Sequence, residues 1–295
     1  MWSVLGHNKN KAYFETVLKN SSASAPGHSA LFHAYLFSGQ EMIGKKTFAL
    51  DLYRNVNGRE EIRSSDLDFK MIFPRLSEGE AKIYIEDIRE IKLFLSLKPN
   101  FGPYKFVVID NAHALTPEAS NALLKILEEP PPFSVIILVT STPKLLPQTI
   151  LSRCQLIRFI PSVEGALDFI KSKKVKNEDA DFLIQMSAGR IGWIEKILES
   201  GELKDAKRAV DDFKKLLKEG TFERMIYAKK AYESKSYPAL VNFWLDWLHY
   251  QLKHGSDIPV SKLKEAAKNL LKLHYLISQP QFNHRLALEN FLINL

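Results

Sequence analysis

A glycine-rich stretch at residues 38–47, SGQEMIGKKT, has the residue types and spacing needed to bind the phosphates of a nucleotide. Gly39, four further residues, Gly44 and Lys45 match the pattern G-x-x-x-x-G-K. In such a loop, backbone N–H groups and a helix N-terminus point at the phosphates, and the lysine reaches the terminal ones. The alternative is a glycine-rich turn that only joins a strand to a helix. The strand-like AYLF before the loop and the helix-like TFALDLYRNV after it favour the phosphate loop.

Two positions of this loop differ from a working phosphate loop. Met42 stands where a glycine often relaxes the turn. Lys46 replaces the serine or threonine whose oxygen would bind magnesium, although Thr47 follows immediately. A protonated lysine cannot coordinate a metal ion. The sequence therefore predicts an inherited phosphate-loop scaffold and leaves open whether a nucleotide still binds.

A second candidate pair follows the apolar run FVVI, which begins at residue 106. Asp110 occupies the place where an aspartate holds the water shell of magnesium in phosphate-loop enzymes. Asn111 occupies the place of the glutamate that polarises the attacking water, and a neutral amide cannot accept that proton. We therefore expect no hydrolysis in the chain's own site. The alternative is a capped turn after a strand, because both side chains bond readily to nearby backbone.

The elements that must position these residues alternate between strand-like and helical patterns up to about residue 160. The strand-like runs are AYLF, FVVI, SVIILVT and LIRF, which begin at residues 34, 106, 134 and 156. This alternation predicts βα units around a parallel sheet. Between the second and third runs, Thr116 can cap a helix, Pro117 suits its first position, and the prolines at 130–132 end it.

Beyond about residue 162 the strand signal disappears, and apolar residues recur at helical spacing. The last helical segments, PALVNFWLDWLHYQLKH and HRLALENFLINL, are richly apolar. A buried core explains their large side chains better than a dedicated interface, although a partner surface stays open as an alternative. The side chains concerned are Trp244, Trp247, Phe291 and Leu292.

Composition narrows the class of protein. The 295 residues, 45% of them hydrophobic, suffice for a substantial core and for two or three domains. The formal charge of +7 is spread along the chain and weakly favours contact with a polyanion. The single cysteine, Cys154, excludes an intrachain disulfide and a zinc site built from cysteines. We expect a soluble cytoplasmic protein without membrane contact, and a loop over the small residues at 20–30.

Three segments resemble the delta-prime subunits of the bacterial DNA polymerase III clamp loader, which are AAA+ proteins. They are FHAYLFSGQEMIGKKTFAL, the long segment from VVIDNAHAL to SRCQLIRF, and the terminal NHRLALENFL. The block NALLKILEEPP followed at the family's distance by SRC is the most specific part. The resemblance covers residues 1 to about 200, weakens through 205–280 and returns at the end of the chain.

The resemblance implies an AAA+ α/β module over residues 1–162, an all-α lid over 163–203 and an all-α collar over 204–295. The collar would pack in a hetero-oligomeric ring with gamma/tau-type and delta-type subunits. This ring would open a sliding clamp, an indirect partner of this chain, and place it on primed DNA. DNA would be contacted through its phosphates, independently of sequence.

The arginine of SRC, Arg153, is implied to point into the ATP site of a neighbouring subunit. Its guanidinium would neutralise charge on the transferring phosphoryl group, which a planar fork suits better than a lysine does. Ser152 and Cys154 would shape the turn that presents it. Cys154 is expected to be a small packed side chain rather than a nucleophile.

Other positions complete the comparison with this family. Thr140, Ser141 and Thr142 follow VIILV, where the family keeps a sensor of the γ-phosphate, and the sequence does not assign one of them. Trp193 falls where an ATP-contacting arginine is expected, and Arg190 is a doubtful substitute. The four-cysteine zinc module of many relatives is missing, so we expect no zinc. ATP and magnesium would bind weakly, if at all, in the chain's own degenerate site, and ATP would be held by the neighbour.

Two other functions stay open. A catalytically active ATPase of the same fold, like the gamma/tau motor subunit, would bind and turn over ATP as an isolated chain. An AAA+ adaptor outside replication would not co-purify with a clamp and other loader subunits. The chain shows no polymerase site, so any polymerase activity would belong to the holoenzyme that it serves.

Overall fold

The computed structural model of the chain describes residues 2–22, 31–62, 66–77 and 80–295. Most of the loop predicted over 20–30 lies outside the described residues, and its first three residues close helix α1 instead.

Two compact units divide the chain. One is Met1–Phe169 with Gly189–Gly192, and the other is Ile170–Ala188 with Trp193–Leu295. Each unit has its own secondary structure and core. The finer division into module, lid and collar stays a prediction.

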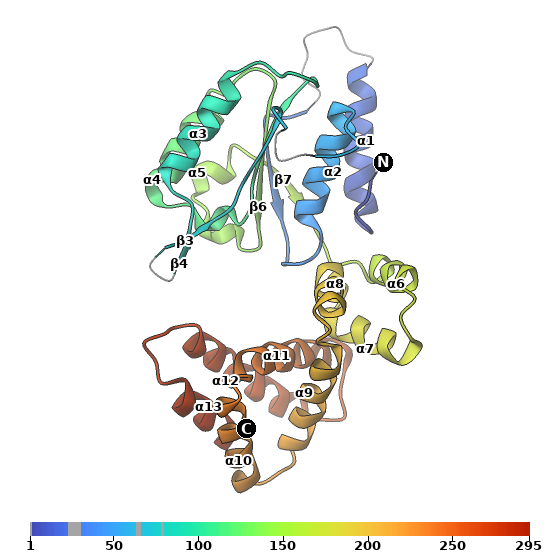
Figure 1. The fold of residues 1–295 in the computed structure, drawn as a ribbon, viewed down its shortest axis with the longest axis vertical. Coiled ribbons are helices and arrows are strands. Elements are labelled where there is room, and N and C mark those ends of the chain that lie inside the picture. Colours follow the sequence, from blue (N-terminus) through green and yellow to red (C-terminus); the bar gives the residue numbers. More distant parts are fainter. Residues whose placement is uncertain (1, 23–30, 63–65, 78–79) are drawn as a thin grey trace. The chain divides into compact units, whose positions relative to one another are not determined.

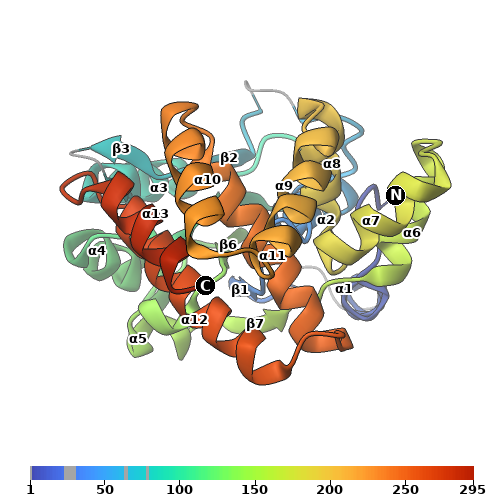
Figure 2. The ribbon, with the colours of Figure 1, turned by 90° about the horizontal axis from the view of Figure 1, so that it is seen from below.

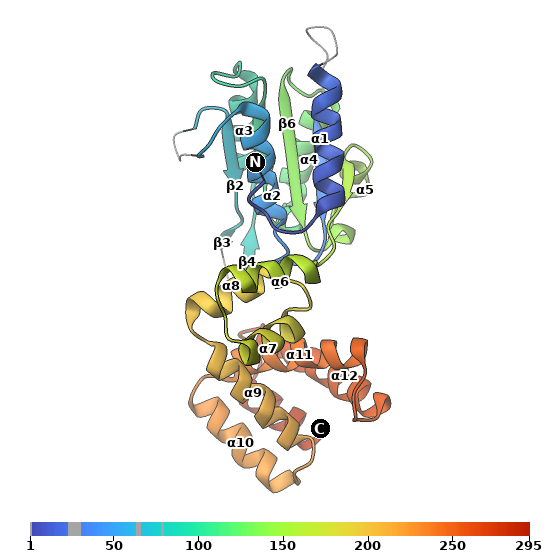
Figure 3. The same cartoon turned by 90° about the vertical axis from the view of Figure 1, so that its right-hand side faces the viewer.

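The first unit is a layered α/β structure around a five-stranded parallel sheet with strand order β2-β5-β6-β1-β7 (Figures 1 and 3). All four runs predicted as strands are strands of this sheet, and β2 is an additional edge strand. The strands are β1 (Ala34–Ser38), β2 (Phe69–Ile72), β5 (Lys105–Ile109), β6 (Ser134–Thr140) and β7 (Gln155–Arg158).

Helices cover both faces of this sheet, with α1 and α2 on one face and α3 and α4 on the other (Figure 1). A separate antiparallel hairpin, β3 and β4, lies outside the main sheet. The bounds are α1 (Asn8–Ser22), α2 (Lys45–Asn57), β3 (Arg75–Ser77), β4 (Glu80–Lys82), α3 (Ile85–Ser96), η1 (Ala112–Ala114), α4 (Pro117–Glu128), η2 (Pro143–Leu145) and α5 (Gln148–Leu151).

Each central strand contributes to two cores, because successive side chains of a strand point to opposite faces of the sheet. Phe106 of β5 packs in the cluster that includes Phe14 of α1 and Phe48 of α2. The next residue, Val107, packs in the cluster that includes Ile91 of α3 and Leu123 of α4. Strands buried on both faces explain why the sequence shows continuous apolar runs rather than alternation.

Helix α4 forms as its sequence predicts. The Thr116 side chain accepts a hydrogen bond from the Ala119 backbone N–H at 3.2 Å, and Pro117 takes the first helical position. The helix ends at Glu128, two residues before Pro130. The apolar face of the helix is buried against the sheet. The capping threonine and the prolines set the two ends of the helix.

The second unit is helical, and residues 159–295, all of which are described, contain no strand. Helix α10 packs along α13, and α11 along α12 (Figure 2). None of the described helices is long and apolar enough to cross a membrane. The helices that lie wholly or partly in this unit are α6 (Val163–Ser172), α7 (Asn177–Ser187), α8 (Ile191–Ser200), α9 (Leu203–Leu216), α10 (Thr221–Glu233), α11 (Tyr237–His254), α12 (Val260–Ile277) and α13 (His284–Ile293).

The core of the second unit is built around Trp244 of α11, which is 0% exposed. Its ring stacks on Phe213 with a centroid distance of 4.9 Å, and its Nε1 donates to the Ala209 carbonyl at 2.9 Å. Trp247, Phe291 and Leu292 are also buried. The prediction that these large apolar side chains form a core is therefore confirmed.

Candidate functional site

The glycine-rich loop connects the carboxyl end of β1 to the first turn of α2. Gly44 has a φ of 92°, a left-handed conformation that favours glycine, and it caps α2. A Cβ atom at Gly39 would lie 2.4 Å from the Phe159 carbonyl oxygen, and one at Gly44 would lie 3.0 Å from Val4 Cγ2. The packing around the loop therefore leaves no room for larger residues at these two positions.

The side chain of Lys45 links two backbone carbonyl groups of its own loop. Its Nζ donates to the carbonyl oxygens of Gly39 at 2.7 Å and of Gln40 at 2.5 Å. The residue is 6% exposed. This burial lowers the pKa of Lys45 to about 8, although the charges of Glu41 and Asp110 raise it in part. The lysine thus loses charge at a far lower pH than a lysine on the surface does.

Lys46 is paired with the aspartate at the end of β5. Its Nζ lies 3.9 Å from Asp110 Oδ2 and 5.5 Å from the centre of the Phe73 ring. An ammonium group has no lone pair to offer a metal ion. The carboxylate predicted to hold the water shell of magnesium is therefore balanced by a cation of this chain, and the hydroxyl-bearing Thr47 beside it is exposed.

Asp110 and Asn111 also shape a turn, as the alternative interpretation expects. Asp110 Oδ1 accepts from the Asn111 backbone N–H at 3.0 Å. Asn111 has a left-handed φ of 49°, and its carbonyl accepts from the Ala114 N–H at 2.8 Å. These bonds set the backbone, while the neutral amide of Asn111 still cannot act as a base.

Met42 holds a left-handed conformation without being glycine. Its φ is 60°, its side chain is 41% exposed, and its carbonyl accepts from the Gly192 N–H at 2.8 Å. Trp193, the next residue, is buried at 6% exposure, and the nearby Arg190 is half-buried. The indole at 193 thus serves packing and brings no cation to the loop.

The three polar residues at the end of β6, Thr140, Ser141 and Thr142, differ in what they contact. Thr140 is 1% exposed, and its Oγ1 lies 3.1 Å from His113 Nδ1 and accepts from the Thr142 N–H at 3.1 Å. Ser141 Oγ donates to Glu41 Oε1 at 3.2 Å, so its hydroxyl reaches the glycine-rich loop. Thr140 contacts the loop through its backbone carbonyl, which accepts from the Gly39 N–H at 3.3 Å, whereas Ser141 contacts it through its side chain.

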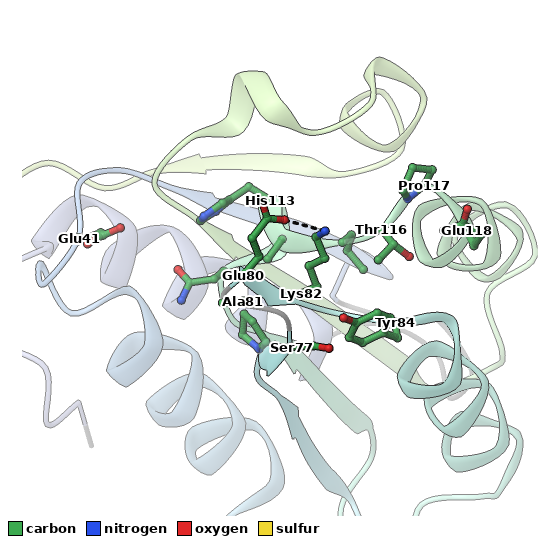
Figure 4. Close-up of a pocket in the computed structure, with 14 residues that line it drawn as sticks. Glu41, Ser77, Glu80, Ala81, Lys82, Tyr84, His113, Thr116, Pro117 and Glu118 are labelled. Carbon is green, nitrogen blue, oxygen red and sulfur yellow. Dashed lines mark ion pairs between the residues drawn. The ribbon is translucent and has the colours of Figure 1, made fainter. Parts of the chain in front are cut away.

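A groove of about 960 Å³ lies next to these strand ends (Figure 4). The figure shows the ion pair between Glu80 and Lys82, 2.6 Å long, at its centre, with Glu118 on α4 at the far side. The lining of the groove contains three carboxylates, those of Glu41, Glu80 and Glu118, and one lysine ammonium group, that of Lys82. This balance disfavours a polyanion in the groove.

Arg153 lies in the turn between α5 and β7. Its Nη2 is 2.7 Å from Glu128 Oε1, and its Nη1 donates to the Thr149 carbonyl at 3.0 Å. About a third of its side chain, 35%, is exposed. The turn precedes β7, whereas the glycine-rich loop follows β1, and these two strands are parallel. Arg153 and the loop therefore lie at opposite ends of these two neighbouring strands.

Cys154, next in the chain, packs against the core between the sheet, α3 and α4. Burial raises the pKa of its thiol to about 12, so the thiolate is scarce at neutral pH. This agrees with a packed side chain rather than a nucleophile.

The sequence profile of one family, described as DNA polymerase III, delta subunit, matches residues 15–162. The chain belongs to this family. The match covers the parallel sheet, the glycine-rich loop and the turn that carries Arg153. The family resemblance inferred from the sequence is thereby confirmed.

Proteins similar in sequence to this chain match different shares of its length. The DNA polymerase III subunit delta' of Pseudomonas aeruginosa is 27% identical over 78% of this chain and 76% of its own length. The subunit tau/gamma of Haemophilus influenzae is 38% identical over 42% of this chain, and the subunit tau of Bacillus subtilis is 31% identical over 61%. The chain spans only 20% and 33% of those two relatives.

A solved structure shares the fold. The crystal structure of a DNA polymerase III, gamma subunit-related protein from Thermotoga maritima superposes with a TM-score of 0.56 at 23% identity, covering 95% of this chain and 97% of that one. This chain therefore shares with that protein an α/β module followed by helices.

Sequence reasoning missed three side chains of these sites. Glu41 places a carboxylate inside a loop that would receive phosphates, and an acidic residue within the motif was a visible signal. Glu128 contacts Arg153. Its position in the last turn of a predicted helix, where the helix dipole disfavours a carboxylate, was a second visible signal. The contact of His113 with Thr140 spans 27 residues and left no signal in the sequence.

Proposed function

We propose that this chain is a delta-prime-like subunit of the DNA polymerase III clamp loader. In this proposal it joins gamma/tau-type and delta-type subunits in a cytoplasmic hetero-oligomer that loads a sliding clamp onto primed DNA. Arg153 acts in trans on ATP held by a neighbouring subunit, and the chain's own loop does not hydrolyse ATP. The position of Arg153 at the end of the strands opposite to the glycine-rich loop carries this proposal.

The distance between the two sites supports action in trans. Strand β7 separates the Arg153 turn, at its amino end, from the end of the strands where the loop lies, and about five residues of extended chain span roughly 16 Å. An arginine side chain cannot bridge that distance to contact a phosphate on its own loop. The exposed part of the guanidinium remains available to another chain. Its planar fork suits phosphate oxygens, and this makes a triphosphate a suitable target.

The chain's own loop does not fit a magnesium–nucleotide complex ready for hydrolysis. Lys46 occupies the position of the metal-binding hydroxyl and pairs with Asp110. Glu41 adds a carboxylate that would repel phosphates, and Asn111 offers an amide where a base is needed. These three features act in the same direction. They favour a subunit that assists hydrolysis elsewhere over a motor subunit.

The experiment that tests this function is Arg153→Ala in the reconstituted assembly. Removal of an arginine that acts in trans costs about 10³-fold or more in turnover in phosphoryl-transfer systems. We expect a loss of that size in clamp-stimulated ATP turnover, with the isolated chain still folded by circular dichroism. Arg158→Ala, an exposed arginine at the other end of β7, is the matched control and should leave turnover near that of the wild type.

Unchanged turnover with Arg153→Ala would contradict the proposal. ATP turnover by the isolated chain would support the motor-subunit alternative instead. Failure to co-purify with a clamp and loader subunits would support an adaptor outside replication.

A further inference from the structure

We propose that Glu128 is a positioning residue that holds Arg153 against its own chain until a neighbouring triphosphate replaces it. This inference rests on the proposed function of Arg153 and adds a control on that function. It assigns a role to a carboxylate at the end of α4 that does not touch the ATP itself.

The geometry shows that part of the arginine's set of N–H donors is already in use. Nη2 bonds Glu128 Oε1 at 2.7 Å, and Nη1 donates to the Thr149 carbonyl at 3.0 Å, with Ser152 Oγ at 3.4 Å. Bidentate recognition of a phosphate needs two N–H groups of the guanidinium side by side. The contact with Glu128 uses one of the groups that such a fork requires. A phosphate that takes this donor as part of its fork must therefore displace Glu128.

The carboxylate is held in place by the helix that carries it. Glu128 is the last residue of α4, and the preceding Ile126 and Leu127 are buried in the core. A carboxylate at a helix C-terminus is disfavoured by the helix dipole, and another, Glu129, follows at once. The ion pair with Arg153 offsets this unfavourable placement.

The pair is weak enough to exchange. The side chains of Arg153 and Glu128 are 35% and 44% exposed, so water and salt screen their attraction. A triphosphate carries several negative charges, whereas Glu128 carries one. The neighbour's nucleotide therefore outcompetes Glu128 once the subunits are close together.

Glu128 therefore makes assembly of this chain with its neighbour less favourable, because the ion pair must break. The free chain holds Arg153 in the paired state, and part of the arginine's attraction for phosphate is spent in breaking that pair. A surface ion pair of this kind shifts an equilibrium by at most about five-fold. Once assembly is complete, the arginine is engaged and the pair no longer matters.

The test is Glu128→Gln in the reconstituted loader, measured as ATP turnover against the concentration of this chain. Glutamine keeps the size of the side chain and removes its charge. We expect the concentration needed for half-maximal turnover to fall by about two- to five-fold. The turnover at saturation should stay unchanged, because the engaged arginine is the same. Glu129→Gln, which removes the adjacent exposed carboxylate, is the matched control and should not move either value.

Other outcomes separate the two proposals. An unchanged half-saturating concentration with Glu128→Gln would overturn the role of Glu128, provided that Arg153→Ala still abolishes turnover. A lower turnover at saturation would also overturn it, because Glu128 would then support the engaged arginine rather than compete for it. If Arg153→Ala itself has no effect, the proposed function fails. Thermal unfolding of each isolated variant verifies that these exposed substitutions leave the fold intact.

Discussion

Lys45 shows how one buried side chain can keep the shape of a nucleotide loop while changing its electrostatics. Its Nζ bridges two carbonyls of the loop and is almost fully shielded from water. Desolvation disfavours the charged form, and the charges of Glu41 and Asp110 compensate only in part. The folded pKa of about 8 lies below the ordinary value of 10.5. The folded state therefore binds fewer protons than the unfolded state between these values, and stability rises with pH across that window.

We predict that the Cε carbon of Lys45 titrates with a midpoint near pH 8 in the folded chain. The measurement is a pH series of carbon NMR spectra on chain labelled at lysine, with the Lys45 signal assigned by its loss in Lys45→Arg. The exposed Lys144 serves as the reference signal within the same unit. A Lys45 midpoint near 10.5 would show that the lysine is solvated and the loop more open than described.

At this scale, spacing predicted the strand, turn and helix around the glycines and Lys45, because that setting depends on the local backbone. The pairing of Lys46 with Asp110 could not be read from the sequence, since the two residues are 64 positions apart and meet only because the parallel strands β1 and β5 end on the same side of the sheet. Which of Thr140, Ser141 and Thr142 contacts the loop through its side chain was equally hidden. That outcome depends on Thr140 turning inward toward His113 and leaving Ser141 to meet Glu41.

Elements of secondary structure are tied together by a buried carboxylate before β2. Asp68 is 0% exposed and accepts backbone hydrogen bonds from Asn100 at 2.8 Å and from Phe101 at 2.6 Å, with Lys105 Nζ 3.6 Å away. Burial alone would raise the pKa of Asp68, but these hydrogen bonds outweigh it and lower the pKa. The bonds fix the loop that leads from α3 into β5, and β5 carries Asp110.

We predict that Asp68→Asn lowers the free energy of unfolding by about 2–3 kcal/mol at pH 7, because hydrogen bonds to a charged group are lost. A lowered folded pKa means that this stabilisation is present above the ordinary value of 3.8 and is lost as pH falls through the folded value. The difference between wild type and variant should therefore shrink on acidification below pH 3.8. Urea titrations at several pH values measure it. Glu90→Gln, an exposed partner of Lys70, should change little at any pH.

The buried strands were predictable because each is an unbroken apolar run, as in SVIILVT for β6. Strand β2 was missed for the opposite reason. It is a four-residue edge strand, FKMI, whose lysine and partly exposed residues give neither alternation nor an apolar run. It becomes a strand by pairing with β5, from Phe69 against Phe106 to Ile72 against Ile109, which is tertiary information.

On the scale of the whole molecule, the chain consists of two units with separate cores. Helical spacing predicted the composition of the second unit, and apolar density predicted its core. The boundary between the units could not be predicted from a linker, because two of its three crossings fall inside helices α6 and α8. The third crossing lies between Ala188 and Gly189, in the short turn that joins α7 to α8. A helix that continues across a boundary gives no linker-like composition at that point.

We predict that Trp244→Ala destabilises the second unit by about 3–5 kcal/mol, because it leaves a large cavity and removes the hydrogen bond from the indole N–H to the Ala209 carbonyl. Hydrogen exchange measured by mass spectrometry should show the greatest loss of protection in α9 and α11. Phe222→Ala, which truncates a side chain that is 73% exposed on α10 of the same unit, is the control and should leave the exchange pattern unchanged in the isolated chain. Equal loss of protection in the parallel sheet would show that the two units unfold together.

The half-buried thiol beside Arg153 has a practical consequence for experiments on this chain. Cys154 is the only cysteine in the sequence, and its pKa of about 12 leaves very little reactive thiolate at neutral pH. Maleimide dyes and spin labels would therefore spare it and react with a cysteine introduced on an exposed helix. Distances across an assembled ring could then be measured by fluorescence transfer without removing the native residue.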